Sequence, residues 1–223
     1  MSKILISGYY GFANAGDEAM LTAIIESLRQ VEKNVELTVL SGNPEDTAAK
    51  HQVCSVYRFN PLGIIRTMKD SELIISGGGS LLQDVTSKRS LLYYLSIIGL
   101  GKFFGKKVML FAQGIGPIRA KWARKLTSLV CNEADLITVR DSESAAELIE
   151  MGVKPEKITV TADSVLSLNP VTKECGQYLL QEAGVDLTKP VIGISVRPWS
   201  GDSQCFQVLA EAASNCSRAM GRS

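Results

Sequence analysis

Three stretches of the sequence combine closely spaced glycines with polar side chains, a combination that suits the binding of an anion. The first, residues 8–19, contains Asn14, Gly16 and Asp17. Glycines let a backbone approach a ligand closely, and a helix N-terminus offers free N–H groups and the positive end of a dipole. We predict that Asn14, Gly16 and Asp17 contribute to a ligand site. The alternative for Asp17 and its neighbour Glu18 is that they only stabilise the helix dipole.

This first loop matches neither of two common nucleotide-binding motifs. The dinucleotide fingerprint GxGxxG needs a glycine two positions after Gly8, where the sequence has Tyr10. Gly11 and Gly16 have the spacing of a P-loop, but two acidic residues follow Gly16 where that motif requires a lysine and a hydroxyl residue. The sequence therefore predicts neither motif at this position.

The second and third stretches each follow an apolar run. Gly77, Gly78 and Gly79 come directly after residues 73–76, and the N–H groups of consecutive glycines can form a concave nest for an anion. A tight connection between a strand and a helix is the alternative. The third stretch, QGIGP, begins at Gln113. We expect both loops to line a ligand site.

Charged residues stand at the ends of later predicted strands. Arg140 lies in the sequence TVRDS, and Asp163 ends the next run. Because an arginine can hold a carboxylate or phosphate through two hydrogen bonds, we predict that Arg140 binds an anion beside Asp163. A structural ion pair of Arg140 with Asp141 or Asp163 is the alternative. Arg197 is the last candidate, whereas the only histidine, His51, lies in a predicted loop and is interpreted as incidental.

Short apolar runs alternate with helical patterns, and these elements must position the loops. The predicted strands are residues 4–7, 36–40, 52–56, 73–76, 107–112, 136–139, 158–161 and 191–196. The predicted helices are residues 17–31, 62–68, 88–104, 121–132, 142–151 and 174–183. Several strands are almost entirely apolar, as expected when both faces are covered. The pattern predicts an α/β fold with a doubly wound parallel sheet, that is, a Rossmann-like domain.

A domain boundary is expected near residue 169. We predict an N-terminal Rossmann-like domain at residues 1–168, an interdomain connection at 169–189 and the start of a second Rossmann-like domain at 190–223. Only about thirty residues remain for the second domain, which is too few for an independent α/β core. The apolar periodicity also ends after Ala213, so we interpret the chain as truncated at its C-terminus.

Composition and charge exclude several classes of protein. The net charge is +1, without the basic excess typical of nucleic-acid binders. The five cysteines are widely scattered, which predicts neither a disulfide framework nor a metal site and favours a cytoplasmic location. The most apolar stretch, residues 91–100, is too short to span a bilayer. We interpret it as a buried helix, with a lipid-contacting surface as the alternative.

Taken together, these motifs resemble those of the polysaccharide pyruvyl transferase family, most closely its CsaB-type members. The order and spacing of the motifs carry the resemblance over nearly all of residues 1–200. The matching segments are residues 8–19, IISGGGSLLQD at 74–84, FAQGIGP at 111–117, VRDS at 139–142, AD at 162–163 and GISVR at 193–197.

The resemblance implies two Rossmann-like domains that face each other across a cleft, as in GT-B glycosyltransferases. It implies transfer of a pyruvyl group from phosphoenolpyruvate to a sugar of a lipid-linked cell-wall polysaccharide precursor, giving a ketal, and it implies no cofactor. It assigns donor binding to Arg140. Peripheral membrane association through the acceptor and a homo-oligomeric state remain open.

The resemblance also implies that a second domain supplies a histidine, the expected general acid or base, and further basic residues. The sequence ends before that region and His51 does not match it. We therefore expect the 223-residue chain itself to have little or no transferase activity. Two other functions stay open: a GT-B-type nucleotide-sugar glycosyltransferase and a non-catalytic α/β binding module.

Overall fold

The computed structural model describes residues 2–195 and 203–220. Contacts divide the chain into two compact units, with the division after Leu168. The first unit contains the sheet and nearly all of the predicted site residues. Arg197 lies outside the described residues, so its predicted place in the site stays a prediction.

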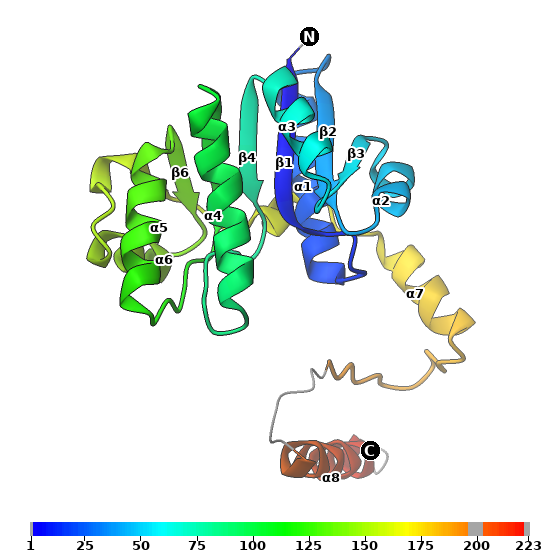
Figure 1. Ribbon diagram of the computed structural model, residues 1–223. Coiled ribbons are helices and arrows are strands. Elements are labelled where there is room, and N and C mark those ends of the chain that lie inside the picture. The colour runs from blue at the N-terminus through cyan, green and yellow to red at the C-terminus, as the bar shows by residue number, and fades with distance from the viewer. Residues whose placement is uncertain (1, 196–202, 221–223) are drawn as a thin grey trace. The chain divides into compact units, whose positions relative to one another are not determined.

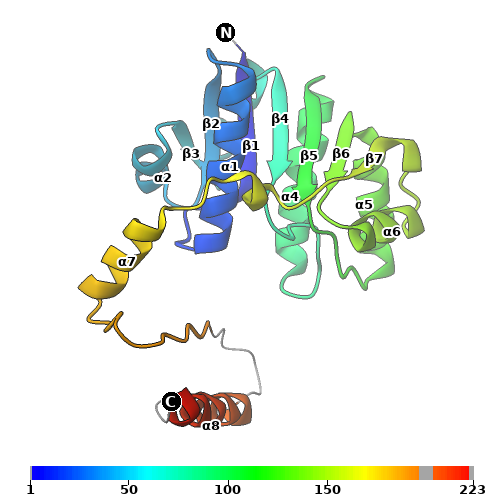
Figure 2. The same ribbon diagram turned by 180° about the vertical axis from the view of Figure 1, so that it is seen from behind.

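The first unit is built on a sheet of seven parallel strands (Figures 1 and 2). Their spatial order is β3-β2-β1-β4-β5-β6-β7. The strands are β1 Lys3–Tyr10, β2 Glu36–Ser41, β3 Cys54–Tyr57, β4 Leu73–Gly77, β5 Lys107–Gln113, β6 Leu136–Val139 and β7 Ile158–Val160. This arrangement confirms the predicted α/β fold with a doubly wound parallel sheet.

Helices cover both faces of this sheet. Helix α1 lies on one face, and α3, α4 and α5 lie on the other (Figures 1 and 2). The helices of the first unit are α1 Ala15–Val31, α2 Pro44–His51, α3 Pro61–Asp70, α4 Lys88–Phe103, α5 Lys121–Glu133 and α6 Ser142–Glu150, with short 3-10 turns at Pro155–Lys157 and Ser164–Ser167.

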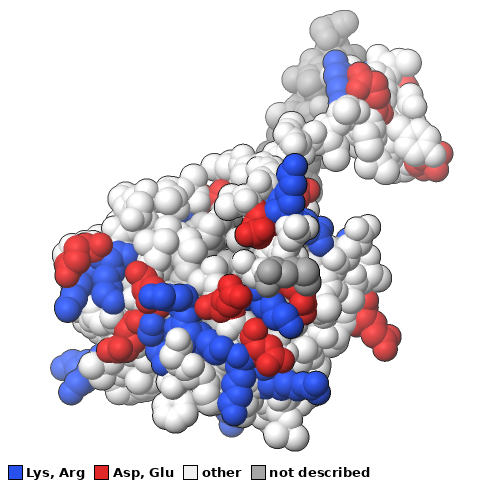
Figure 3. All heavy atoms as spheres, turned by 90° about the horizontal axis from the view of Figure 1, so that it is seen from above, with Lys and Arg blue, Asp and Glu red and all other residues white. Residues whose placement is uncertain are grey.

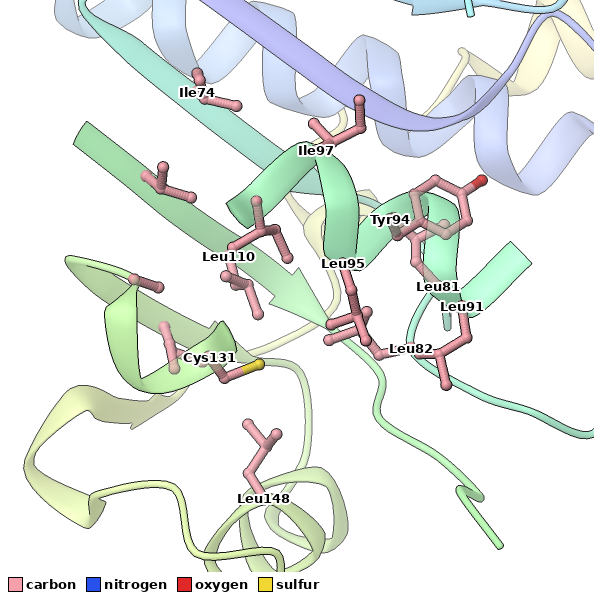
Figure 4. Close-up of a cluster of buried hydrophobic side chains, with 14 of the residues drawn as sticks. Ile74, Leu81, Leu82, Leu91, Tyr94, Leu95, Ile97, Leu110, Cys131 and Leu148 are labelled. Atoms are coloured by element: carbon pink, nitrogen blue, oxygen red, sulfur yellow. The ribbon is translucent and has the colours of Figure 1, made fainter. Parts of the chain in front are cut away.

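Alternation along each strand divides the apolar core into two layers. Leu5 of β1 packs with the helices α3 to α6, whereas Ile4 and Ile6 pack with α1. Figure 4 shows side chains of the larger layer converging from β4, β5 and α4, among them Ile74, Leu110 and Tyr94. Because successive side chains of a strand point to opposite faces, a sheet between two helical layers needs apolar residues at nearly every position.

Helix α2 was not predicted, and the expectation of a loop around His51 is wrong. Only Thr47 is buried in this helix, so the sequence carries no apolar stripe that would reveal it. The helix is instead held at its start, where the side chain of Asn43 accepts a hydrogen bond from the N–H of Asp46 and Pro44 occupies the first turn. His51 lies at its last position.

The second unit contains the helices α7 (Lys173–Glu182) and α8 (Ser203–Met220). Residues 191–195 form no strand, contrary to the prediction for 191–196, and residue 196 lies outside the described residues. Helix α8 continues past Ala213, where the sequence loses its apolar periodicity, to Met220. No glycine or proline interrupts its sequence, which favours a continuous helix.

Two findings describe the surface of the described residues. None of the helices in the described part of the chain is long and apolar enough to cross a membrane. On the face at the amino ends of the strands, basic and acidic side chains are interspersed (Figure 3). One cluster there is centred on Asp135, whose carboxylate accepts hydrogen bonds from Lys102 at 2.7 Å, Lys107 at 3.2 Å and the N–H of Val108 at 2.9 Å.

This cluster makes folding stability depend on pH. Burial tends to raise the pKa of Asp135, but the hydrogen bonds from Lys102, Val108 and Lys107 outweigh it and lower the pKa from 3.8 to about 2. A carboxylate with a depressed pKa stabilises the fold above its unfolded-state pKa, and this contribution is lost as the pH falls from about 4 towards 2. We predict that Asp135→Asn lowers the free energy of unfolding at pH 7 by about 1–2 kcal/mol.

The measurement is urea unfolding of the wild type and the variant at pH 7 and at pH 3. The difference between the two proteins should shrink at pH 3, because the Asp135 carboxyl of the unfolded wild-type chain is then mostly protonated and this proton uptake favours unfolding. Asp70→Asn, at an exposed aspartate at the end of α3, is the matched control. An equal difference at both pH values would contradict the prediction.

Candidate functional site

The order of the strands reverses between β1 and β4. From β1 the chain proceeds to β2 and β3 on one side, and from β4 it proceeds to β5, β6 and β7 on the other. In such sheets a crevice opens beyond the carboxyl ends of the two strands, and ligands bind there. The loop after β1 and the glycines after β4 both flank this position, as the sequence analysis expects.

Tyr10, at the end of β1, joins the two strands at this point. The side chain is fully buried, and its hydroxyl donates a hydrogen bond to the carbonyl oxygen of Gly77 at 2.5 Å. Burial, with a smaller contribution from Asp17, raises the pKa of Tyr10 well above its usual value. The residue is therefore a neutral phenol at physiological pH. Tyr10 was not predicted as a site residue, although it continues the alternation of Ile4 and Ile6 that marks the α1 side of the strand.

Gly77 ends β4, and Gly78 and Gly79 form a tight connection after it. Gly78 and Gly79 have φ angles of 85° and 68°, in the left-handed region that favours glycine. The N–H of Gly79 donates to the sulfur of Met20 at 3.0 Å, and its carbonyl accepts from the N–H of Gly114 at 3.1 Å. These contacts favour the tight-turn interpretation, because they use the polar backbone groups of Gly79 within the fold.

Arg140 is the centre of the polar groups at the carboxyl edge. Nη1 lies 3.2 Å from the carboxylate of Asp163, Nε lies 3.4 Å from that of Asp141, and Nη2 donates to the hydroxyl of Ser80 at 3.1 Å. About a third of the side chain is exposed. Both ion pairs that the sequence left open are therefore present, and they hold an arginine that a dissolved anion can still reach.

The groups around Arg140 come from four neighbouring strands. Ser80 follows β4, Gly114 follows β5, Arg140 follows β6 and Asp163 follows β7. A Cβ atom on Gly114 would lie 2.7 Å from Nη2 of Arg140 and 2.6 Å from Oγ of Ser80. The guanidinium thus packs against Gly114, where any side chain would collide with it. Neither Ser80 nor Gly114 was singled out from the sequence, although both lie inside the glycine-bearing motifs.

Gln113 and Asp141 support Arg140 from the protein side. Gln113 is buried, donates from Nε2 to Ser76 at 2.9 Å, and accepts the N–H of Arg140 on its backbone carbonyl at 3.1 Å. Asp141 caps helix α6, and its hydrogen bonds with Ser144, followed by those with Arg140, lower its pKa. Gln113 therefore positions β6 against β5.

Asn14, Gly16 and Asp17 lie in the first turn of α1. The side chain of Asn14 accepts the N–H groups of Gly16 at 3.1 Å and Asp17 at 3.4 Å, which is a helix cap. One carboxylate oxygen of Asp17 lies 3.0 Å from the position a Cβ would take on Gly79. The structure thus brings Asp17 to the glycines after β4, whereas Asn14 and Gly16 remain exposed at the helix end.

Glu18 and His51 have a structural partnership that the sequence did not indicate. One carboxylate oxygen of Glu18 accepts the N–H of Gly11 at 2.8 Å, and the other lies 3.0 Å from Nε2 of His51. The His51 ring is also 3.5 Å from the hydroxyl of Thr22. Glu18 therefore connects the glycine loop, α1 and α2. The described residues contain no cluster of three or more His, Cys, Asp or Glu side chains that could hold a metal ion.

The strand order, with its reversal between β1 and β4, and the loops at the carboxyl ends of the strands define a Rossmann-like α/β domain of the kind found in GT-B enzymes. Solved structures support this class. Anabaena Alr3699/HepE in complex with UDP and glucose superimposes with a TM-score of 0.60 at 14% identity, over 95% of this chain and 58% of that one. The UDP-GlcNAc 2-epimerase of Neisseria meningitidis bound to UDP-GlcNAc gives 0.54 at 12% identity, over 85% and 55%.

A glycosyltransferase of Rickettsia africae also gives a TM-score of 0.54 at 12% identity, over 90% of this chain and 54% of that one. The chain thus spans a little more than half the length of these structures. No curated protein matches the sequence. Residues 14–199 match the family model of the polysaccharide pyruvyl transferases, and the chain belongs to that family.

The surroundings of Gly78 and Gly114 predict different effects for alanine substitutions at these two positions. Gly78→Ala places a Cβ 2.8 Å from the Tyr10 hydroxyl on a backbone with positive φ, so it should lower the free energy of unfolding by roughly 1–3 kcal/mol. Gly114→Ala meets only the ends of two side chains and should cost less than about 1 kcal/mol. It should nevertheless displace the guanidinium of Arg140.

Urea unfolding measures the loss of stability in Gly78→Ala. The ¹⁵N NMR signal of Arg140 Nε, assigned with Arg140→Lys, measures the displacement of the guanidinium in Gly114→Ala. Gly114→Ala should shift that signal while the backbone spectrum beyond the loop stays unchanged. Wild-type stability in Gly78→Ala, or an unmoved Arg140 signal in Gly114→Ala, would contradict this view of the site.

Proposed function

We propose that the protein acts in the cytoplasm as a CsaB-type pyruvyl transferase. It would move a pyruvyl group from phosphoenolpyruvate to a sugar of a lipid-linked cell-wall polysaccharide precursor and form a ketal. Family membership supports the class of reaction. The observation that carries the donor assignment is the position of Arg140, which lies at the carboxyl edge of the sheet and is held by groups from three other strand ends.

The chemistry of the donor explains why a fixed arginine is useful. Phosphoenolpyruvate carries a carboxylate and a phosphate. When its methylene carbon accepts a proton, C2 becomes electrophilic, one sugar hydroxyl adds to C2 and the C2–O bond to phosphate breaks. Inorganic phosphate leaves when this bond breaks, and a second hydroxyl of the sugar then adds to C2. Of the two protons that the hydroxyls lose, one replaces the proton taken up by the methylene carbon and the other passes to the phosphate. A preorganised guanidinium stabilises an anion throughout these steps, since its charge is permanent.

The ion pairs of Arg140 are compatible with donor binding. Partly exposed ion pairs contribute only about 0–1 kcal/mol each, so an incoming anion can replace one of them at little cost. The hydrogen bond to Ser80 and the contact with Gly114 keep the guanidinium in place during that exchange. We assign donor binding to Arg140. We assign the role of general acid or general base to none of the described residues.

We also propose that residues 190–223 belong to a second domain, with residues 169–189 as the connection. The division of the described chain into two compact units after Leu168 supports a boundary at this point. The lipid-linked acceptor would bring the protein to a membrane surface.

Titration calorimetry with phosphoenolpyruvate tests the donor assignment without requiring turnover. We predict that Arg140→Gln weakens binding by about 10- to 100-fold, because one charge-assisted interaction is lost. Arg119→Gln, at an exposed arginine near the same loops, should leave binding unchanged.

A parallel titration with UDP-glucose separates the donor classes. Binding of UDP-glucose without binding of phosphoenolpyruvate would overturn the proposal in favour of a nucleotide-sugar transferase. Equal affinity of the wild type and Arg140→Gln for phosphoenolpyruvate would overturn the role of Arg140.

A further inference from the structure

Arg58 follows β3 directly and is buried among aromatic side chains, with only 5% of the residue exposed. The central carbon of its guanidinium lies 4.4 Å from the ring centre of Tyr93 and 5.2 Å from that of Phe59. Three more rings lie 5.3–6.0 Å away, those of Phe12, Tyr94 and Tyr9. Five rings from three parts of the chain therefore surround one cation.

The charge of Arg58 has no counter-ion within the described part of the chain. Nη2 donates to the hydroxyl of Tyr94 at 3.3 Å, but Nε is buried without a hydrogen-bond partner. No carboxylate of the described residues forms an ion pair with it. Aromatic faces attract a cation by roughly 0.5–2 kcal/mol, but they do not satisfy an orphaned N–H group.

A cavity of about 300 Å³ adjoins this arginine between α3 and α4. Apart from Arg58 and Ser96, its lining is apolar or aromatic. The remaining lining residues are Phe59, Pro61, Ile64, Ile65, Tyr93, Ile97 and Leu100. The hydroxyl of Tyr93 is a second buried polar group without a hydrogen-bond partner in the described chain. Arg58 and Tyr93 thus bring a buried cation and a buried hydroxyl group to the wall of the cavity, and most of the remaining wall is hydrocarbon.

We propose that this cavity binds an amphiphilic phosphate, with the anionic head on Arg58 and Tyr93 and a hydrocarbon chain between α3 and α4. Phosphate oxygens satisfy Nε and the charge of Arg58 together, because a guanidinium binds an oxyanion through parallel hydrogen bonds. The hydrocarbon chain of the ligand packs against the apolar wall. Each CH₂ group that it buries there stabilises binding by about 0.8 kcal/mol. A small anion alone would leave that wall unfilled.

This site is separate from Arg140. A phosphate joined to a hydrocarbon chain is what a lipid-linked acceptor presents, and in that respect the inference rests on the proposed function. The binding itself does not depend on transfer. A failure of donor binding at Arg140 and a failure of amphiphile binding at Arg58 are therefore distinguishable by measuring each ligand by itself.

Decyl phosphate, kept below the concentration at which it forms micelles, is the probe, and titration calorimetry is the measurement. Inorganic phosphate tests the head alone and decanol tests the chain alone. We expect decyl phosphate to bind at least about tenfold more tightly than either, since both parts contribute. Arg58→Gln should remove that advantage, whereas Arg66→Gln, at an exposed arginine on α3, and Arg140→Gln should preserve it.

Arg58 is buried, so its substitution could impair folding, and a second variant keeps the test decisive. Ser96 is exposed at the cavity and its hydroxyl only contacts its own helix, which makes Ser96→Trp a filler of the cavity with little risk to the core. This variant should weaken decyl phosphate binding at least about tenfold while its circular dichroism matches the wild type. Equal affinity for decanol and decyl phosphate, or unchanged binding in Ser96→Trp, would overturn the inference.

Discussion

The hydrogen bond from Tyr10 to Gly77 joins the two strands between which the sheet reverses its order. Its geometry constrains the residues around it. A Cβ on Gly8 would lie 2.4 Å from the ring of Tyr10, and a Cβ on Gly78 would lie 2.8 Å from its hydroxyl. The glycines that look like a ligand motif are therefore also required by a tyrosine that fills the space between β1 and β4. At Gly8 and Gly78, the packing of Tyr10 and the formation of a ligand site both require glycine.

The glycines after β4 and β5 connect this pair of strands to Arg140. Gly79 accepts the N–H of Gly114, and Gly114 leaves room for the guanidinium. A displacement of the loop after β4 would consequently also move the loop after β5, and with it the guanidinium of Arg140. The arginine gains its fixed position from this chain of close contacts, and each contact depends on the absence of a side chain. A lysine at position 140 would lack the planar group that bonds Ser80, Asp163 and Asp141 together.

The fold could be predicted from the sequence because buried parallel strands carry a strong local signal. Residues 73–76 and 107–112 are nearly continuous apolar runs followed by glycines, and both are strands. Helix α2 could not be predicted, since it buries one threonine and depends on its cap. The partners of Arg140 were named as alternatives, but Ser80 and Tyr10 were not, because their roles arise from contacts across strands that lie 60 and 67 residues apart in the chain. Such contacts leave no local pattern.

The two candidate anion sites differ in a way that follows from the sheet itself. Arg58 follows β3 and Arg140 follows β6, and β2, β1, β4 and β5 lie between them. At about 4.8 Å for each strand, the two strand ends are about 24 Å apart along the carboxyl edge. A small donor therefore cannot contact both arginines. Arg140 is partly exposed among carboxylates and suits a small, exchangeable anion, whereas Arg58 lies beside an apolar cavity and suits an anion with a hydrocarbon chain. An extended acceptor held by its lipid phosphate at Arg58 would lie along the same edge as the donor, with the carboxyl ends of β1 and β4 between the two arginines.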